Sequence, residues 1–195
     1  MKIWCATGNP GKLREFRLAG ELLDVDVEPL PDLKSIEAPE ETGATFEENA
    51  CLKAAYYSRF APGLLFADDS GLEVDALGGE PGVRSARYAG EHATDEENNR
   101  LVVSRLGENS DRTSRFVCVI ALAKGGEVVK TFRGAVEGQL LREAAGPAGF
   151  GYDPLFYYPP FGCSFGEVDG ARKFGVSHRG NAVRAMLEWL SLNPR

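Results

Sequence analysis

Two neighbouring aspartates form the most chemically informative part of the sequence. Asp68 and Asp69 follow the apolar residues 64–67 and precede Ser70 and Gly71, which are expected to turn the chain. Carboxylates at the end of a buried strand are costly unless they are paired or bound to a cation. Strand ends are also where open α/β sheets bind ligands, and Mg²⁺ is held by one or two carboxylates together with substrate phosphates. The alternative is a solvated turn, because Asp, Ser and Gly all favour turns.

A second candidate is a glycine-containing loop between a predicted strand and a predicted helix. It consists of Thr7, Gly8, Asn9, Pro10, Gly11 and Lys12. Free backbone N–H groups and the positive end of the helix dipole favour a phosphate there, and Lys12 adds a full charge. The loop lacks the G-x-x-x-x-G-K-[ST] pattern of a Walker loop. An ordinary strand–helix turn is the alternative interpretation.

An acidic pair, Glu40 and Glu41, precedes a helix that carries Asn49 and Lys53. Acidic residues before a helix usually complement its dipole. As metal ligands they would need Asp69 nearby. The helical repeat places Asn49 and Lys53, four residues apart, on one face.

Two later segments carry aromatic and polar side chains suited to a nucleobase. The first, after a glycine-rich stretch, contains Phe150, Gly151, Tyr152 and Asp153. Stacking of a base on an aromatic ring is worth about 1–3 kcal/mol. The alternative is that Phe150 and Tyr152 anchor the loop to the core.

The second of these segments opens the last predicted helix and contains Lys173, Ser177, His178 and Arg179. Helix N-termini bind polar ligands, which favours a role for these side chains. The alternative is a helix cap at Ser177 with His178 on the surface.

The elements that must position these residues follow from hydrophobic periodicity and turn signals. Strands are predicted at 2–6, 25–30, 64–68, 116–124, 127–135 and 136–141. Helices are predicted at 12–23, 45–59, 94–106 and 179–192, two of them opened by capping boxes at Thr45 and Thr94. Strands alternating with helices, followed by a hairpin at Gly125-Gly126, predict a mixed α/β sheet. The 195 residues suggest one domain or two small lobes around a groove.

Composition narrows the class of protein further. A net charge of −7 argues against binding to nucleic acid or to an anionic membrane. The four cysteines are widely spaced, which favours reduced thiols over a zinc site. No signal peptide is visible, and the longest apolar run, 116–123, is too short to span a bilayer. A cytoplasmic protein is therefore expected.

Taken together, these segments resemble the non-canonical purine nucleoside triphosphate pyrophosphatases, also called inosine triphosphate pyrophosphatases or XTP/dITP diphosphatases. The similar motifs are T-x-N-x-x-K at 7–12, E-T-G-x-T-F-x-E-N-A at 41–50, A-D-D-S-G-L at 67–72, L-G-G-x-P-G-x-x-S-A-R-Y at 77–88, F-G-Y-D-P at 150–154 and S-H-R-G at 177–180. They cover nearly the whole chain in order.

The resemblance implies an α/β fold of two lobes, with a long central mixed sheet and an active-site cleft between them, in a single domain over residues 1–195. It implies hydrolysis of ITP, dITP and XTP to the monophosphate and pyrophosphate, which cleanses the nucleotide pool and prevents incorporation into DNA and RNA. It also implies a Mg²⁺ cofactor and a homodimer.

The resemblance, joined to the chemistry above, gives each candidate a role. Asp69 is expected to hold the metal and to activate or orient water, with Glu40 or Glu41 as its partner. Phosphate contacts are assigned to residues 7–12, Lys53 and Ser70. Phe150 is expected to stack on the base. The residues expected to contact the base edge and the sugar side are Asp153, Lys173, His178 and Arg179, and Gly151 and Tyr152 are further candidate substrate contacts.

Two other classes of protein remain as alternatives. A Maf-like nucleotide pyrophosphatase would act on pyrimidine or modified nucleotides, and the F-G-Y-D and S-H-R segments argue against it. A non-catalytic nucleotide-binding module would be expected to lose a carboxylate, whereas Asp68 and Asp69 are both present.

Overall fold

The computed structural model describes residues 1–22 and 24–193. The strands are β1 (Lys2–Cys5), β2 (Asp26–Pro29), β3 (Leu65–Val74), β4 (Thr113–Lys124), β5 (Glu127–Leu140), β6 (Phe156–Tyr158) and β7 (Cys163–Ser164). The helices are α1 (Pro10–Leu22), α2 (Phe46–Tyr57), α3 (Asp95–Leu106), α4 (Gly170–Phe174) and α5 (His178–Leu192). Short 3₁₀ helices occupy Leu33–Ser35, Asp75–Leu77, Gly82–Arg87, Pro159–Phe161 and Phe165–Glu167.

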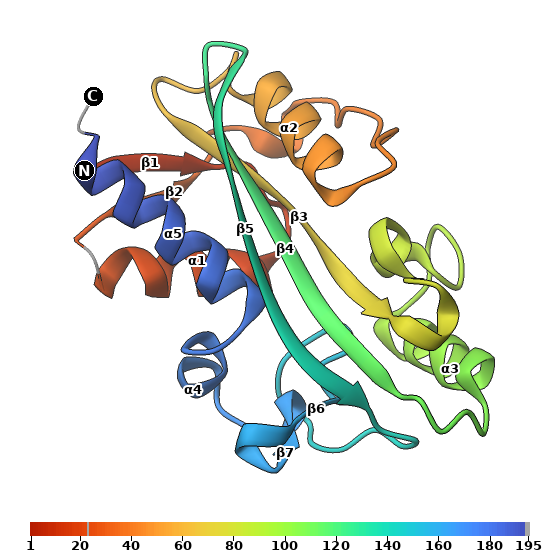
Figure 1. The fold of residues 1–195 in the computed structure, drawn as a ribbon. Helices are drawn as coiled ribbons and strands as arrows, with labels where there is room; N and C mark the ends of the chain where they lie inside the picture. The colour runs from red at the N-terminus through yellow and green to blue at the C-terminus, as the bar shows by residue number, and fades with distance from the viewer. Residues whose placement is uncertain (23, 194–195) are drawn as a thin grey trace. The chain divides into compact units, whose positions relative to one another are not determined.

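The strands form one mixed sheet in the order β2-β1-β3-β4-β5-β6-β7, drawn as arrows in Figure 1. β1 runs parallel to β2 and to β3, with Trp4 opposite Leu65. β6 runs antiparallel to β5 and to β7. The predicted mixed α/β class is confirmed.

The chain divides into two compact units. Unit 1 comprises Met1–Asp69, Cys118–Gly134 and His178–Arg195, and unit 2 comprises Ser70–Val117 and Ala135–Ser177. Strands β3, β4 and β5 each have residues in both units.

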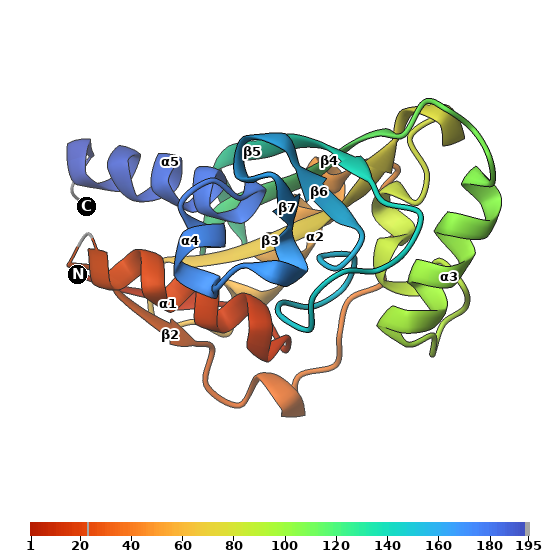
Figure 2. The ribbon, with the colours of Figure 1, turned by 90° about the horizontal axis from the view of Figure 1, so that it is seen from below.

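In unit 1, α1 and α5 lie side by side, as Figures 1 and 2 both show. The helical repeat of α5 buries Val183, Met186, Leu187 and Leu190, as its sequence pattern predicts. The close packing of α5 depends on Gly134 of β5, where a Cβ would lie 2.2 Å from the carbonyl oxygen of His178.

In unit 2, α3 lies beside the 3₁₀ helix Gly82–Arg87 (Figure 2). The predicted capping box at Thr94 is present, since Thr94 accepts from the Glu97 N–H and Glu97 accepts from that of Thr94. Both Val102 and Leu106 of α3 join a buried cluster with residues of β3, β4, β5 and β6. This cluster is the core that supports the loop before β6.

The structure corrects several predicted element boundaries. β3 does not end at Asp68 but continues to Val74, so the two aspartates lie inside a strand of 10 residues. Gly71 does not turn the chain, because it lets the strand approach Ser85: a Cβ there would lie 2.3 Å from Ser85 Oγ. Ser85 Oγ also accepts a hydrogen bond of 2.9 Å from the Leu72 N–H.

Other differences concern the later strands and helices. The two strands predicted at 127–135 and 136–141 form the single strand β5, in which every second residue from Phe132 to Leu140 is buried. The sequence pattern does not predict the short elements β6, β7 and α4, because none is long enough to show a hydrophobic period. Helix α1 begins at Pro10 rather than Lys12, because proline is favoured in the first turn. Its predicted end, Leu23, lies outside the described residues.

Candidate active site

The two aspartates of β3 pair with lysines from two different helices of unit 1. The Asp68 carboxylate lies 2.7 Å from Lys12 Nζ of α1. The Asp69 carboxylate lies 3.0 Å from Lys53 Nζ of α2. Successive side chains of a strand point to opposite faces of the sheet, which explains why adjacent carboxylates have different partners. The two aspartates therefore serve separate contacts.

Glu41 joins Asp69 at the same lysine. Its carboxylate lies 3.2 Å from Lys53 Nζ, so two carboxylates of unit 1 converge on one ammonium group. Glu40, by contrast, is exposed. Where the sequence left the choice open, the geometry favours Glu41 as the partner of Asp69. We call Glu41, Asp68 and Asp69, together with Lys12 and Lys53, the acidic cluster.

Asn49 connects the strand of the acidic cluster to the loop that carries Glu41. Its Nδ2 donates to Asp69 Oδ2 at 3.2 Å, and its Oδ1 accepts from the Gly43 N–H at 2.8 Å. Only glycine fits at position 43, where a Cβ would lie 2.6 Å from Asn49 Oδ1. The side chain is fully buried, so these hydrogen bonds satisfy an amide that would otherwise be costly.

The loop at 7–12 differs from the expectation of free N–H groups. Asn9 Oδ1 accepts hydrogen bonds from the N–H groups of Gly11 and Lys12, at 2.8 and 3.1 Å. Asn9 thus caps α1. Two of the backbone N–H groups that the sequence suggests as phosphate donors are therefore already hydrogen-bonded to Asn9. The side chain of Lys12, rather than the backbone, is the stronger candidate for an anion contact.

Burial and charge set the pKa values of the two aspartates in opposite directions. Burial opposes ionisation of Asp68, but the neighbouring cations, Lys12 first among them, outweigh it and hold its pKa below the usual value. For Asp69, burial is the strongest influence and raises the pKa above the usual value, although Lys53 favours the charged form. Asp69 is therefore the more basic of the two carboxylates.

Arg179 at the start of α5 lies in unit 1 and forms an ion pair with Glu15 of α1. Both side chains are largely buried, and Arg179 also favours the charged form of Asp68. His178, the first residue of α5, is buried as well, with 3% of its surface exposed. The alternative of a surface histidine is therefore wrong.

Three of the predicted base-contacting residues meet in unit 2. Lys173 Nζ lies 2.6 Å from Asp153 Oδ2, and each of these side chains is only 3% exposed. The same Asp153 oxygen accepts from the Phe150 N–H at 2.9 Å. Lys173 Nζ also lies over the Phe150 ring, 4.8 Å from its centroid, which is a cation–π contact. The carboxylate and the ammonium group thus compensate each other where neither is exposed to water.

The neighbouring residues hold this loop by backbone shape and by burial. Gly149 has a φ of +79°, and a Cβ there would lie 2.2 Å from Asp153 Oδ2, so glycine is required. Tyr152 is buried, and its hydroxyl donates to the Ser85 carbonyl at 2.8 Å. For Tyr152 the geometry favours the alternative role, which is to anchor the loop to the core.

Comparison with known proteins identifies the family. The family model of the Ham1 family matches residues 3–189. The chain belongs to the Ham1 family. It is 47% identical to a protein of Acidobacterium capsulatum named dITP/XTP pyrophosphatase, over 96% of this chain and 97% of that one. A protein of Thermus thermophilus with the same name is 49% identical, over 96% of this chain and 91% of that one.

Solved structures agree with this assignment. A HAM1 protein from Coxiella burnetii superimposes with a TM-score of 0.88 at 38% identity, covering 98% of this chain and 99% of that one. The Ham1 protein of Staphylococcus aureus gives a TM-score of 0.87 at 40% identity, covering 98% of both chains. The resemblance seen in the sequence motifs is thus confirmed.

The predicted site residues of this Ham1 protein are divided between the two units. Unit 1 holds Thr7, Gly8, Asn9, Pro10, Gly11, Lys12, Glu40, Glu41, Lys53, Asp69, His178 and Arg179, and unit 2 holds Ser70, Phe150, Gly151, Tyr152, Asp153 and Lys173. Sequence reasoning gave no role to Asn49, Asp68 or Glu15. For Asn49, its spacing from Lys53 on one face of the helix is the sequence feature that could have indicated a role.

The acidic cluster is suited to a divalent cation bound together with phosphates. Within residues 1–22 and 24–193, no group of three or more His, Cys, Asp and Glu side chains is arranged to hold a metal by itself. Glu41 and Asp69 nonetheless supply two carboxylates that both lie within 3.2 Å of Lys53 Nζ. Mg²⁺ usually takes only one or two carboxylate ligands from the protein. The donor set therefore fits Mg²⁺ that is shared with a substrate.

None of the helices among the described residues is both long enough and apolar enough to cross a membrane.

Proposed function

We propose that this Ham1 protein hydrolyses non-canonical purine nucleoside triphosphates, namely ITP, dITP and XTP, to the monophosphate and pyrophosphate. The observation that carries this conclusion is the convergence of Glu41 and Asp69 on Lys53, in a chain that matches named dITP/XTP pyrophosphatases over almost its full length. Neither the Maf-like alternative nor the non-catalytic alternative is favoured by these relatives.

Asp69 is the best candidate to orient and deprotonate the attacking water. Its carboxylate is held in place by Asn49 and Lys53, which donate to it at 3.2 and 3.0 Å. A carboxylate fixed in this way can accept a proton from water as the P–O bond forms. Attack at the α-phosphorus would transfer the nucleoside monophosphoryl group to water and release pyrophosphate.

Lys12 and Lys53 are the candidates for phosphate contacts. Each ammonium pairs with a carboxylate of the acidic cluster, which holds it at a defined position before substrate binds. Two such charges favour a triphosphate and stabilise the negative charge that develops on the leaving pyrophosphate.

We infer that Mg²⁺ is the cofactor and that Asp69 and Glu41 would hold it. When bound, the ion supplies neutralisation of phosphate charge. The acidic cluster supports this assignment, because Glu41, Asp68 and Asp69 carry three negative charges against the two positive charges of Lys12 and Lys53.

In unit 2, the arrangement of Phe150, Asp153 and Lys173 supports their proposed role at the base. The Phe150 ring is half-buried, so part of its surface is available for stacking. The paired Asp153 and Lys173 provide one acceptor and one donor beside it. His178 and Arg179 are proposed to contact the base as donors.

The reaction itself gives the first testable prediction. With dITP or ITP and MgCl₂, the purified protein is expected to release pyrophosphate and monophosphate at equal rates, with no orthophosphate, and EDTA is expected to stop the reaction. A pyrophosphate-coupled assay with chromatography of the nucleotides measures both products across dITP, ITP, XTP, dATP, dGTP and dUTP. Nucleoside diphosphate as the first product, or a preference for dUTP, would contradict the proposal.

We also propose that the protein is a homodimer, which is supported by the resemblance to the family. Light scattering coupled to gel filtration at micromolar concentration is expected to give twice the mass of the chain. A monomer mass under these conditions would count against the dimer. The cytoplasmic location, and the lack of nucleic-acid and membrane partners, stay predictions from the sequence.

A further inference from the structure

We propose that Asp95 and Asn99 of α3 are positioning residues for the nucleobase. They would act by fixing the backbone at Gly151, between Phe150 and Asp153. The inference rests on the proposed function, because it takes Phe150 and Asp153 as base contacts. Neither residue belongs to a motif from which the site was predicted.

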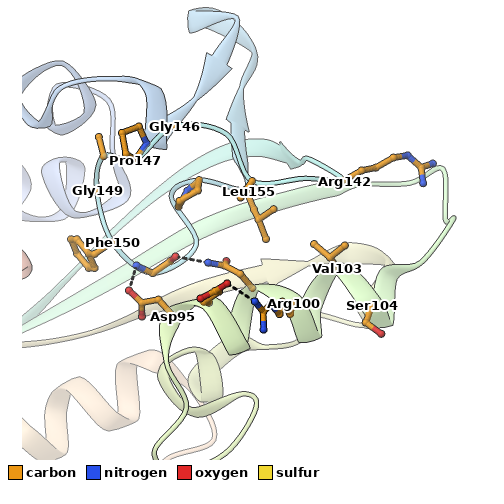
Figure 3. A pocket seen from close by; sticks show the side chains of 16 residues that line it. Asp95, Arg100, Val103, Ser104, Arg142, Gly146, Pro147, Gly149, Phe150 and Leu155 are labelled. Atoms are coloured by element: carbon orange, nitrogen blue, oxygen red, sulfur yellow. Dashed lines mark hydrogen bonds and ion pairs between the residues drawn. The ribbon is translucent and has the colours of Figure 1, made fainter.

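Two side chains of α3 hydrogen-bond to the backbone of the same glycine (Figure 3). Asp95 Oδ2 accepts from the Gly151 N–H at 2.6 Å. Asn99 Nδ2 donates to the Gly151 carbonyl oxygen at 2.9 Å. The two residues are four apart in a helix and therefore lie on one face. This face presents an acceptor and a donor in the spacing that the backbone of Gly151 requires.

The two hydrogen bonds act on different peptide planes. The Gly151 N–H belongs to the plane shared with Phe150, and its carbonyl belongs to the plane shared with Tyr152. Holding both planes determines the two backbone angles of Gly151. This matters because Gly151 has a φ of +61°, and glycine is the residue with the widest choice of conformations. The two side chains of α3 therefore hold Gly151 in one of the many backbone conformations that a glycine can adopt.

That conformation is transmitted to the proposed base contacts through short links. Phe150 shares a peptide plane with Gly151, and its own N–H donates to Asp153 Oδ2 at 2.9 Å. Lys173 Nζ lies 2.6 Å from the same oxygen. A rotation at Gly151 would thus move the Phe150 ring relative to the Asp153 carboxylate and to Lys173.

Packing does not replace these hydrogen bonds on the α3 side. A cavity of about 660 Å³ lies between α3 and the segment 142–155, and it is lined by Val103, Pro147 and Leu155 among others. Figure 3 shows Val103 and Leu155 reaching into this space from opposite sides. Where the loop borders a cavity, hydrogen bonds rather than close-packed atoms restrict its movement.

The test compares two double variants of α3. Asp95→Ala/Asn99→Ala removes both contacts to Gly151. Glu96→Ala/Arg100→Ala is the matched control, because it removes an exposed pair that also lines the cavity and is also spaced i, i+4. Each double variant removes one acidic residue from the first turn of α3, so effects on the helix dipole are comparable.

The readout separates base binding from phosphate binding. Inhibition by IMP, which carries the base, is compared with inhibition by pyrophosphate, which does not. For Asp95→Ala/Asn99→Ala we expect KM for dITP and Ki for IMP to rise about tenfold, the size of effect given by losing one or two modest hydrogen bonds. We expect kcat and Ki for pyrophosphate to change less than about twofold, because they do not depend on the loop that carries Phe150 and Asp153.

A conservative variant distinguishes positioning from a loss of charge. The amide oxygen of Asp95→Asn can still accept from the Gly151 N–H, so this variant is expected to keep IMP inhibition close to wild type. The control double variant is expected to do the same, with melting temperatures measured for every protein.

Three results would overturn the inference. They are equal increases in both inhibition constants, unshifted IMP inhibition in Asp95→Ala/Asn99→Ala, and the same IMP shift in the control. If the wild-type protein releases pyrophosphate from dITP normally, each of these results overturns this inference but not the proposed function. A wild-type protein that releases no pyrophosphate from dITP would overturn the proposed function, and this inference with it.

Discussion

Replacing Asp69 by Asn is expected to remove most hydrolysis of dITP while leaving the fold intact. The amide is the same size as the carboxylate, so the local packing survives, and its single oxygen can keep one of the two hydrogen bonds that Lys53 and Asn49 donate to separate oxygens of Asp69. It has no negative charge to hold a cation and is too weak a base to take a proton from water. The loss in kcat is expected to be on the order of 10²-fold or more, because one group supplies both functions.

The measurement is the steady-state rate of pyrophosphate release at saturating MgCl₂, with circular dichroism and the melting temperature as checks of the fold. Asp75→Asn is a matched control, since Asp75 is also an ion-paired aspartate, 2.8 Å from Arg115. It lies outside the acidic cluster and is expected to keep normal turnover. Near wild-type turnover in Asp69→Asn would remove Asp69 from the proposed mechanism.

Replacing Arg179 by Ala is expected to lower kcat/KM for ITP far more than for ATP. Hypoxanthine presents a 6-oxo acceptor, whereas adenine presents a 6-amino donor at the same position. An arginine only donates hydrogen bonds, so it favours the first base and is left facing a donor by the second. Because buried unpaired polar groups are costly, loss of this donor should reduce the ITP/ATP ratio by about tenfold or more.

The structure adds a control to this experiment. Arg179 is paired with Glu15, and both are largely buried, so Arg179→Ala leaves a carboxylate without its partner and is expected to lower the melting temperature. Glu15→Gln disturbs the same pair but keeps the arginine, and should leave the ITP/ATP ratio near wild type. Equal losses for both nucleotides in Arg179→Ala would assign the arginine to the phosphates or to the fold.

Local signals in the sequence determined much of the secondary structure and the choice of site residues. The capping boxes at Thr45 and Thr94 mark the starts of α2 and α3, because a cap depends only on residues within one helical turn. The apolar repeat near the end of the chain marks α5 for the same reason. The family motifs, in order along the chain, predicted the family and the class of reaction.

The tertiary structure alone decided where β3 ends and how its carboxylates are used. The sequence predicts a turn after Asp69. In the structure Ser85, fourteen residues beyond Gly71, lies against this segment and accepts a hydrogen bond from the Leu72 N–H, which keeps the segment extended. The separate pairing of Asp68 and Asp69 with Lys12 and Lys53 likewise depends on which helix covers each face. Such contacts join residues far apart in the chain, so a local pattern does not contain them.

The same distinction applies to the finer choices within the site. Glu40 and Glu41 are equivalent in sequence, and only the folded loop, held by the contact of Gly43 with Asn49, directs Glu41 toward Lys53. Tyr152 is an aromatic residue of the kind that can stack on a base, yet its hydroxyl donates a hydrogen bond to the Ser85 carbonyl inside the core. Residue type and spacing determined which side chains could do the chemistry. Burial and long-range hydrogen bonds decided where each of them lies, because both depend on the whole chain around the residue.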